Sequence, residues 1–584
     1  MGLDRDDFFG RLKEQLKPLV TEALSAEFGD LGPLVFKFET PPDQSMGHLA
    51  LACFPFAKAA KSAPPKIAAN LAASLSAQAA LEPLAYITAA GPYLNFMLKP
   101  AYLAAQLMPQ VTQPDFGDAS LGRGQRVLLE YSSPNTNKPL HLGHGRNNLL
   151  GMALANLLER VGYEVTKANL VNDRGIHICK SMLAYQRWGN GITPESNQQK
   201  GDKLVGDFYV LYDQKSKEIE GLDEAASEML RQWEAGEPEV RKLWAQMNQW
   251  VMAGFKETYQ RLGCQFDQFY FESETFESGR QIVLDAKEKG LCQVEDNGAL
   301  SIDLDDLGWG KKILLRGDGT SMYITQDLGT TVQKYQDHQF DRSFFVVGNE
   351  QDLHFKMLFE VLKRFGYDWA ERLEHISYGM ITLPEGKMKS REGTVVDLDD
   401  LLDGMKELAI EEIKARDNLA VEQIEATAEA IGQAAVKYYI LRAGAAKEIQ
   451  FNPKESLAFE GATGPYLQYT HARIHSLLSK AVLEAEAQPV LDGAGPWGDG
   501  EREMLVLLAR YYEAQVQAAT DRNPAVLCSY LFDLAKGFNK YYYETPILRG
   551  EAKMLPGRLG LCAAVRAVLA KGLTTLGIEP LDKM

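Results

Sequence analysis

The sequence predicts an α/β protein built on a doubly wound parallel sheet, with a mixed segment before the sheet and a helical segment after it. Two observations favour this fold class. An apolar strand at 127–131 (VLLEY) is followed by a loop, a helical pattern at 145–161 and a second strand at 164–171 (EVTKANLV). Strands joined through a helix run parallel, because the crossover returns the chain to the same end of the sheet. The flanking segments lack this alternation.

The segment before the sheet, residues 1–112, is predicted to be an α+β domain. It opens with a helical pattern at 8–24 and continues with an apolar alternation at 34–39 and Ala-rich helical stretches. It closes on a strand pattern at 93–98 (YLNFML). The stretch at 112–126 is rich in turn-forming residues and is predicted to be a linker.

The central domain is predicted to span residues 120–400 with a Rossmann-like topology. Its first helix carries four apolar side chains on one face and Arg146 on another, and it ends at Gly162. A polar, mostly helical insertion occupies about residues 190–265. Later strand and helix patterns extend the alternation, at 312–316 (KILLR), 344–348 (FFVVG), 352–366 (helix) and 375–383 (HISYGMITL).

The remaining chain reads almost entirely as helix, predicting connecting helices at 401–455 and an all-α bundle at 456–584. A length of 584 residues suits about three or four domains. The six cysteines form no CxxC pair, the start of the chain does not resemble a signal peptide, and no run of about 18 apolar residues occurs. We therefore expect a cytoplasmic protein with no membrane contact.

The net charge of −17 argues against a dedicated nucleic-acid binder, because polyanions are attracted by Lys and Arg. An acidic protein can still carry a local basic groove, so any claim about nucleic acid must rest on particular residues.

The tetrapeptide HLGH at 141–144 lies where the first strand leads into its helix. Backbone N–H groups and the positive end of the helix dipole make such a loop a phosphate site. His141 and His144 face the same side of the first turn and can donate hydrogen bonds to phosphoryl oxygens. Gly143 leaves room for a flat ring against the backbone. By itself the motif is explained equally well by two surface histidines that cap a helix.

The longer string LEYSSPNTNKPLHLGHGRNNLLG resembles the HIGH signature of class I aminoacyl-tRNA synthetases. The Glu–x–Ser–x–Pro–Asn lead-in and Lys138, three residues before the first histidine, are similar to arginyl-tRNA synthetases in particular. The resemblance implies that ATP lies over His141, Gly143 and His144, with Mg²⁺ accompanying the nucleotide and no resident metal.

The segment GKMKSREGTVV at 386–396 resembles the second class I signature, KMSKS, in a degenerate form. Ser390 stands where the family often has a second lysine, and Lys389 lies one place earlier. Which cation meets the pyrophosphate is therefore open, and Lys138 is expected to compensate for the weak loop. The nucleotide contacts implied here are Lys387, as a catalytic cation, with Met388, Ser390 and Arg391.

An arginine substrate requires an acidic pocket, because its planar and permanently charged guanidinium is best held by carboxylates. YITQD at 323–327 resembles the family helix whose tyrosine and aspartate face the substrate, and a spacing of four places both on one helical face. The resemblance implies an arginine pocket lined by Glu130, Asn135, Glu272, Tyr323, Asp327 and Gln351, with His354 on the adenosine side.

Three weaker patterns complete the sequence. HARIH at 471–475 has metal-like spacing but lacks a third ligand, so a packed helix surface is favoured. NDRGIH at 172–177 follows a strand and is expected to border the site. Arg473 and the tyrosines at 541–543 can stack on unpaired anticodon bases or fill the bundle core, and both interpretations are open.

The first hundred residues and the helical end also resemble the tRNA-contacting N-terminal domain and the anticodon-binding domain of arginyl enzymes. The resemblance implies an arginine–tRNA ligase that forms arginyl-adenylate from arginine and ATP and transfers arginine to the 3′ end of tRNA(Arg), as a monomer. The alternatives are a class I synthetase of another specificity, such as glutaminyl or cysteinyl, a nucleotidyl transferase without tRNA, and a catalytically inactive RNA-binding paralogue.

Overall fold

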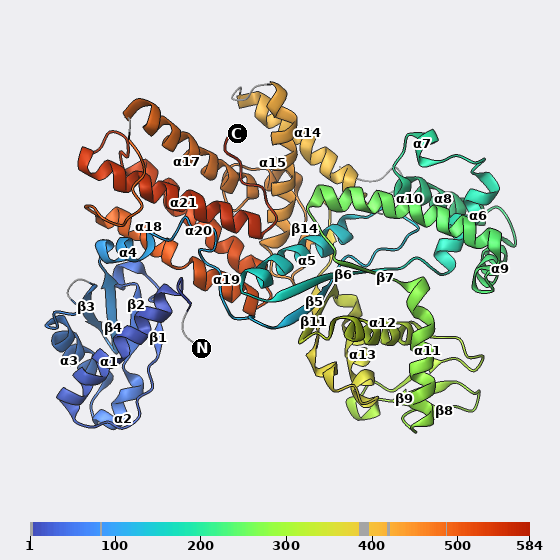
Figure 1. Cartoon of the computed structure of the whole chain (residues 1–584), viewed down its shortest axis with the longest axis horizontal. Coiled ribbons are helices and arrows are strands. Elements are labelled where there is room, and N and C mark those ends of the chain that lie inside the picture. The colour runs from blue at the N-terminus through green and yellow to red at the C-terminus, as the bar shows by residue number, and fades with distance from the viewer. Residues whose placement is uncertain (1–3, 82–83, 385–395, 417–420, 486) are drawn as a thin grey trace.

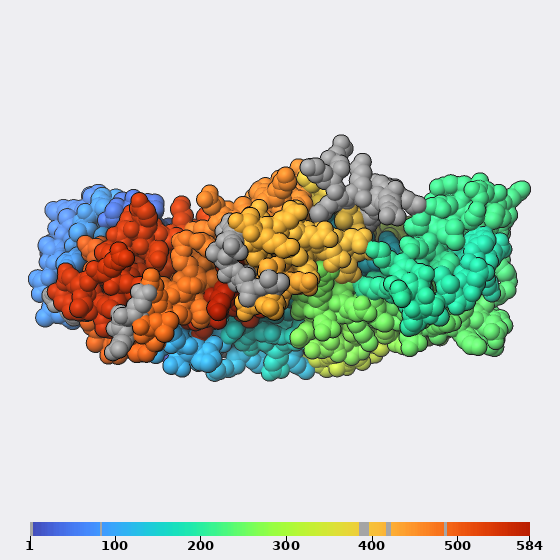
Figure 2. Space-filling view, turned by 90° about the horizontal axis from the view of Figure 1, so that it is seen from above, coloured from blue at the N-terminus to red at the C-terminus, as the bar shows by residue number. Residues whose placement is uncertain are grey.

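The computed structural model describes residues 4–81, 84–384, 396–416, 421–485 and 487–584. Figure 1 shows an elongated molecule, with the N-terminal domain at one end and the helical insertion at the other. The space-filling view in Figure 2 shows the same two segments at opposite ends of the long axis. The central sheet and the C-terminal helices lie between them.

The central sheet has five strands in the order β12-β11-β5-β6-β7, all paired in parallel. The chain builds outward from β5 through β6 and β7, and then returns to the other side of β5 with β11 and β12. This reversal confirms the predicted doubly wound topology and places a switch point between β5 and β11. The strands are β5 (Arg126–Glu130), β6 (Glu164–Val171), β7 (Gln268–Phe271), β11 (Arg342–Gly348) and β12 (Leu373–Tyr378).

Three of the predicted strand patterns form different strands from those expected. The KILLR segment forms β10 (Lys311–Leu315), which pairs antiparallel with β9 (Leu300–Asp303) in a separate sheet, and β8 (Gln293–Val294) pairs with the other side of β9. The segment at 375–383 breaks after β12, and β13 (Ile381–Thr382) pairs instead with β14 (Ile449–Gln450). The alternation at 34–39 forms only the two-residue strand β1 (Phe38–Glu39).

The first crossover helix, α5 (Leu142–Arg160), is buried on almost all sides, because the sheet covers one side and C-terminal helices cover another. Arg146, predicted away from the apolar face, is fully buried. Its guanidinium donates to the carbonyls of Gly379, Met380, Ala445 and Lys447 at 2.6–2.9 Å. A planar group with five donors can satisfy several carbonyls at once, which stabilises it in the interior.

The N-terminal segment forms an antiparallel sheet in the order β1-β2-β4-β3, with helices packed on it. The helix predicted at 8–24 is confirmed as α1 (Phe8–Phe28), and the strand predicted at 93–98 is confirmed as β4 (Tyr93–Leu98). The other elements are β2 (Leu49–Ala52), β3 (Ala85–Ala90), α2 (Ala57–Ala60), α3 (Pro64–Ser76) and α4 (Pro100–Leu107).

The rest of the described chain is helical, as the sequence predicts. The insertion contains α7 (Pro194–Asn197), α8 (Gly201–Ser216), α9 (Leu222–Glu234) and α10 (Pro238–Leu262). The central domain adds α6 (Ile176–Trp188), α11 (Glu272–Glu288), α12 (Tyr323–His338) and α13 (Asp352–Arg364). The C-terminal helices are α14 (Leu398–Arg416), α15 (Val421–Leu441), α16 (Pro453–Ser456), α17 (Gly464–Ala485), α18 (Asp499–Ala509), α19 (Tyr511–Thr520), α20 (Pro524–Glu544) and α21 (Leu555–Thr575). Within the described ranges, every helix is too short or too polar to cross a bilayer.

Candidate active site

A cavity of about 710 Å³ lies at the carboxyl ends of β5, β6 and β11, beside the switch point of the sheet. Ligands bind at this position in doubly wound folds, because the strand ends diverge there and leave a crevice. The cavity brings together seven residues singled out in the sequence, which come from different elements: Glu130, Asn135, Glu272, Tyr323, Asp327, Gln351 and His354.

The chain leaves β5 through two residues with left-handed backbone angles, Ser132 (φ 81°) and Ser133 (φ 49°). Such angles cost free energy in residues other than glycine, so the surroundings must hold them. Asn147 accepts from the backbone N–H of Ser132 at 2.5 Å, and Asn169 accepts from that of Ser133 at 3.1 Å. These buried amides fix the turn that carries Asn135 to the cavity wall.

The HLGH turn caps α5 through its own side chains. His141 accepts the N–H of Gly143 at 3.1 Å, and His144 accepts the N–H of His141 at 3.2 Å, each through Nδ1. A neutral imidazole that accepts at Nδ1 carries its proton on Nε2. Burial, reinforced by Lys138, lowers the pKa of His141 to about 4, and burial lowers the pKa of His144 well below its usual range. Both rings are therefore neutral Nε2–H donors at pH 7.

Glycine at position 143 is required by the turn itself. A Cβ there would lie 2.9 Å from Cε1 of His141, so the flat ring that lies against this backbone is the imidazole of His141. The two imidazole centroids are 3.9 Å apart. Neither ring lines the 710 Å³ cavity, whose wall includes Glu130, Ser133 and Asn135 from the end of β5 and the segment that leads to the HLGH turn.

The segment that follows the second signature is joined directly to the HLGH turn. The N–H of Leu142 donates to Val396 at 3.1 Å, and the N–H of Leu398 donates to Leu140 at 2.9 Å. Half-buried Lys138 precedes this pairing, and burial lowers its pKa. The four signature residues themselves lie outside the described residues: Lys387, Met388, Ser390 and Arg391.

The carboxylates of the cavity are held in three different ways. Asp327 contacts Nε2 of His354 at 2.6 Å. Glu130 is buried in an ion pair with Lys334. Glu272 lies beside the amide of Gln326, and burial raises its pKa to about 7, an effect that Arg174 opposes and Asp327 reinforces. Tyr323 is 80% exposed at the start of α12 and forms the rim.

Sequence reasoning missed the cations of this cavity, which are Arg174, Lys312, Arg316 and Lys334. Lys334 lies seven residues after Asp327 on α12 and therefore shares its face, a signal that helical periodicity contains. Arg174 belongs to NDRGIH, and the expectation that this motif borders the site is confirmed, because the segment 174–178 lines the cavity. Asp173 accepts from the N–H and hydroxyl of Ser273 at 2.9 and 2.6 Å, which holds the start of α11.

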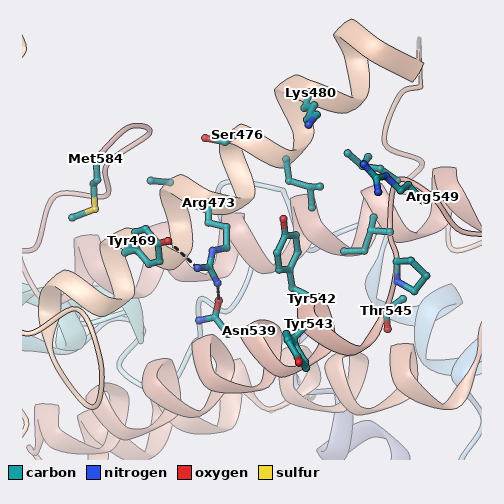
Figure 3. Close-up of a pocket in the computed structure, with 15 residues that line it drawn as sticks. Tyr469, Arg473, Ser476, Lys480, Asn539, Tyr542, Tyr543, Thr545, Arg549 and Met584 are labelled. Carbon is teal, nitrogen blue, oxygen red and sulfur yellow. Dashed lines mark hydrogen bonds between the residues drawn. The ribbon is translucent and has the colours of Figure 1, made fainter. Parts of the chain in front are cut away.

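A second cavity, of about 920 Å³, lies on the C-terminal bundle between α17 and α20 (Figure 3). Arg473 donates to Asn539 at 2.7 Å and to the hydroxyl of Tyr469 at 2.8 Å. The three tyrosines differ in burial. Tyr541 is buried with its hydroxyl on Glu501 at 2.9 Å, whereas Tyr542 and Tyr543 line the cavity.

The HARIH pattern belongs to the neighbouring face of α17. His471 donates from Nδ1 to the carbonyl of Leu581 at 2.8 Å, which secures the C-terminal tail. Over the described ranges, no group of three or more His, Cys, Asp or Glu side chains is arranged to hold a metal ion.

Known protein families match the chain in three consecutive parts. The N-terminal domain of arginyl tRNA synthetase matches residues 14–98, and the catalytic domain of class I tRNA synthetases (R) matches residues 108–452. The DALR anticodon binding domain matches residues 467–584. The fold and the cavity at the sheet edge thus occur in the class I tRNA synthetase part of the chain.

Individual relatives give the same result over nearly the full length. The chain is 43% identical to the arginine–tRNA ligase of Treponema denticola, covering 94% of this chain and 95% of that protein. It is 42% identical to that of Phocaeicola vulgatus, covering 98% and 100%. The solved arginyl-tRNA synthetase of Thermus thermophilus superposes with a TM-score of 0.79 at 27% identity, over 97% of this chain and 100% of that one. The chain belongs to the arginyl-tRNA synthetase family.

Proposed function

We propose that this protein is an arginine–tRNA ligase, which activates arginine with ATP and transfers it to the 3′ end of tRNA(Arg). The observation that carries the proposal is the cavity at the switch point. It places two carboxylates, Asp327 and Glu272, in one pocket immediately beyond the strand that leads to the HLGH turn. A guanidinium fits such a pair, because a carboxylate fork matches its planar donors.

Each end of the arginine has its own set of residues in this proposal. Asp327, Glu272 and Tyr323 receive the guanidinium. Glu130 and Asn135 hold the α-amino and carboxylate ends, and Gln351 adds a further substrate contact. Glu130 is also paired with Lys334. A pocket lined by buried carboxylates rejects side chains without a guanidinium, because the acids would lose their partners.

ATP lies over the HLGH turn in this proposal. The Nε2–H groups of His141 and His144 donate to phosphoryl oxygens as charge develops on them. The adenosine lies beside the His141 ring that covers Gly143 and against His354, and Mg²⁺ arrives with ATP as its counter-ion. Lys138 and Lys387 stabilise the departing pyrophosphate, with contacts from Met388, Ser390 and Arg391.

Two transfers follow from this placement. A carboxylate oxygen of arginine attacks the α-phosphorus, the bond from that phosphorus to the bridging oxygen breaks, and pyrophosphate leaves with the electron pair. A terminal ribose hydroxyl of the tRNA then attacks the carbonyl carbon, and AMP leaves as the hydroxyl proton is transferred. The protein accelerates both steps by positioning the reactants and by stabilising the charge that forms.

The remaining domains bind tRNA in this proposal. The cavity around Arg473, Tyr542 and Tyr543 receives unpaired anticodon bases, because exposed aromatic rings and a guanidinium stack on them. The chain then divides into four parts: residues 1–112, 120–400, 401–455 and 456–584. The first contacts the outer corner of the tRNA, the second is catalytic, the third connects, and the fourth binds the anticodon. We further propose a cytoplasmic monomer.

An ATP–pyrophosphate exchange assay across the amino acids, with and without tRNA, tests the proposal. We expect exchange with arginine and only when tRNA(Arg) is present. Exchange without tRNA would indicate a nucleotidyl transferase, and exchange with another amino acid would indicate a synthetase of that specificity. An absence of exchange under all conditions would indicate an inactive RNA-binding paralogue.

A further inference from the structure

One arginine of the protein itself forms part of the cavity wall. Arg174 lines the same cavity as Glu272 and Asp327, yet its side chain is only 10% exposed. Its guanidinium carbon lies 4.0 Å from the ring centroid of Phe276, and Nη2 donates to Glu234 of α9 at 2.7 Å. The insertion and α11 therefore hold this guanidinium in place.

Gln326 lies between Arg174 and Glu272. When its amide nitrogen is turned toward Glu272 and its amide oxygen toward Arg174, the nitrogen donates to Oε1 of Glu272 at 2.5 Å and the oxygen accepts from Nη1 of Arg174 at 3.3 Å. A carboxamide has one donating and one accepting side, so the arginine and the acid together determine its orientation. The four side chains Glu234, Arg174, Gln326 and Glu272 form a continuous chain from the insertion into the pocket.

We propose that Arg174 and Gln326 are specificity-determining residues that keep Glu272 an oriented carboxylate, so that the pocket distinguishes a charged guanidinium from an uncharged isostere. This inference rests on the proposed function, which makes Glu272 a guanidinium partner. A neutral carboxyl would interact almost as well with a urea group as with a guanidinium. The charged form favours the cation, because charge-assisted hydrogen bonds are stronger than neutral ones.

The charges around Glu272 support this role. Arg174 and Asp173 face it from the turn after β6, and Asp327 faces it from α12. Burial raises the pKa of Glu272 to about 7, Asp327 and Asp173 raise it further, and Arg174 lowers it. Arg174 is itself paired with Glu234, and Asp327 is paired with His354. The other charged groups that line the cavity are the Lys334–Glu130 pair, Lys312 and Arg316. Removal of Arg174 leaves only acids directly facing Glu272, and its pKa must then rise.

The sign of the pH dependence follows from this arrangement. Arginine binds the ionised form of Glu272, so the apparent Kd is constant above the pKa of that carboxyl. Below the pKa the Kd increases by about tenfold per pH unit, because one proton must be displaced. A variant with a higher pKa reaches its plateau only at a higher pH.

Calorimetric titration of the full chain with L-arginine, from about pH 5.5 to about pH 8.5, tests the proposal. We expect the wild-type Kd to level off near pH 7. This pH, at which the plot of Kd against pH breaks, should rise by about one unit in Arg174→Met. Arginine binding then weakens about tenfold at neutral pH and much less at the alkaline end. Gln326→Met should shift the break in the same direction by a smaller amount.

Arg241→Met is the matched control. The guanidinium carbon of Arg241 lies 3.6 Å from the ring centroid of Trp233, a ring that is also 5.6 Å from the guanidinium of Arg174. Arg241 does not line the cavity, so this variant should keep the wild-type pH dependence. Citrulline, which carries a urea in place of the guanidinium, is the second ligand. The ratio of citrulline to arginine Kd should fall in Arg174→Met and stay unchanged in Arg241→Met.

The alternative outcomes are distinct. An Arg174→Met chain whose Kd is weaker by one constant factor at every pH would overturn the proposal, because the arginine would then be only structural. Should circular dichroism show that this variant does not fold, Gln326→Met decides, and an unshifted break there overturns the proposal. A wild-type chain that prefers another amino acid would instead overturn the proposed function, and the inference with it.

Discussion

The cavity at the sheet edge and the cavity on the C-terminal bundle use charge in opposite ways. At the sheet edge, the acids are half-buried or buried and are held by residues from distant elements, as in the pairs Glu130–Lys334 and Asp327–His354. On the bundle, Arg473 is held by two polar neighbours, and Tyr543 is 91% exposed.

The difference indicates two kinds of ligand. Charges that are fixed and shielded from water bind a small ion of matching charge selectively, because a ligand without that charge leaves them unpaired. Exposed rings beside a cation accept a larger, adaptable partner, to which each contact contributes modestly. Substitutions should therefore have large effects at the sheet edge and small ones on the bundle.

The largest effect is expected for Asp327→Ala. Loss of the main guanidinium partner should reduce arginine-dependent exchange by about a thousandfold, because a half-buried charge-assisted contact is lost. Unchanged circular dichroism should show that the fold survives, and the exposed Gln336→Ala on the same helix serves as control. Near-normal exchange in the Asp327 variant would contradict the acidic-pocket interpretation.

Lys334→Met should have the next largest effect, on stability. It leaves Glu130 buried without its partner, which costs about 3–5 kcal/mol of unfolding free energy. Urea denaturation measures this loss. The double variant Lys334→Met, Glu130→Gln should recover much of it, since no uncompensated charge remains. A single variant as stable as the wild type would show that the pair is not essential.

His144→Ala should slow adenylate formation by about a hundredfold, the usual effect of one lost hydrogen-bond donor to developing charge. Arginine affinity should change little, because the ring does not line the acidic cavity. Single-turnover kinetics with tRNA present, together with calorimetry, separate the two quantities. An unchanged single-turnover rate would exclude a phosphate role for this histidine.

Tyr543→Ala should have the smallest effect. Loss of one stacking ring should weaken tRNA binding by about tenfold, a cost of the order of 1–3 kcal/mol per base, with no change in thermal stability. Tyr541→Ala, which removes a core ring, should lower the melting temperature instead. Equal effects of the two variants on stability would refute the division between stacking and core tyrosines.

Local patterns in the sequence determined the central alternation of strand and helix, the helical C-terminal part and the long helix α1. These features depend on the spacing of apolar residues and on turn formers, which a short window contains. The same window could not reveal β7, a four-residue edge strand, or the burial of Arg146, whose four carbonyl partners lie more than 200 residues away.

For the candidate site, the motifs by themselves determined which acids, histidines and amides to consider, because residue type and order are written in the chain. Only the tertiary structure decided how each is held. Glu130 is paired with a lysine 204 residues away, and Asp327 is paired with His354. Glu272 is linked to a glutamine and an arginine that lie within YITQD and NDRGIH, although neither motif by itself assigned them this role. The physical reason is that the protonation state and the orientation of a buried charged group depend on its neighbours in space. A doubly wound sheet brings these neighbours together from strand ends that lie far apart in the sequence.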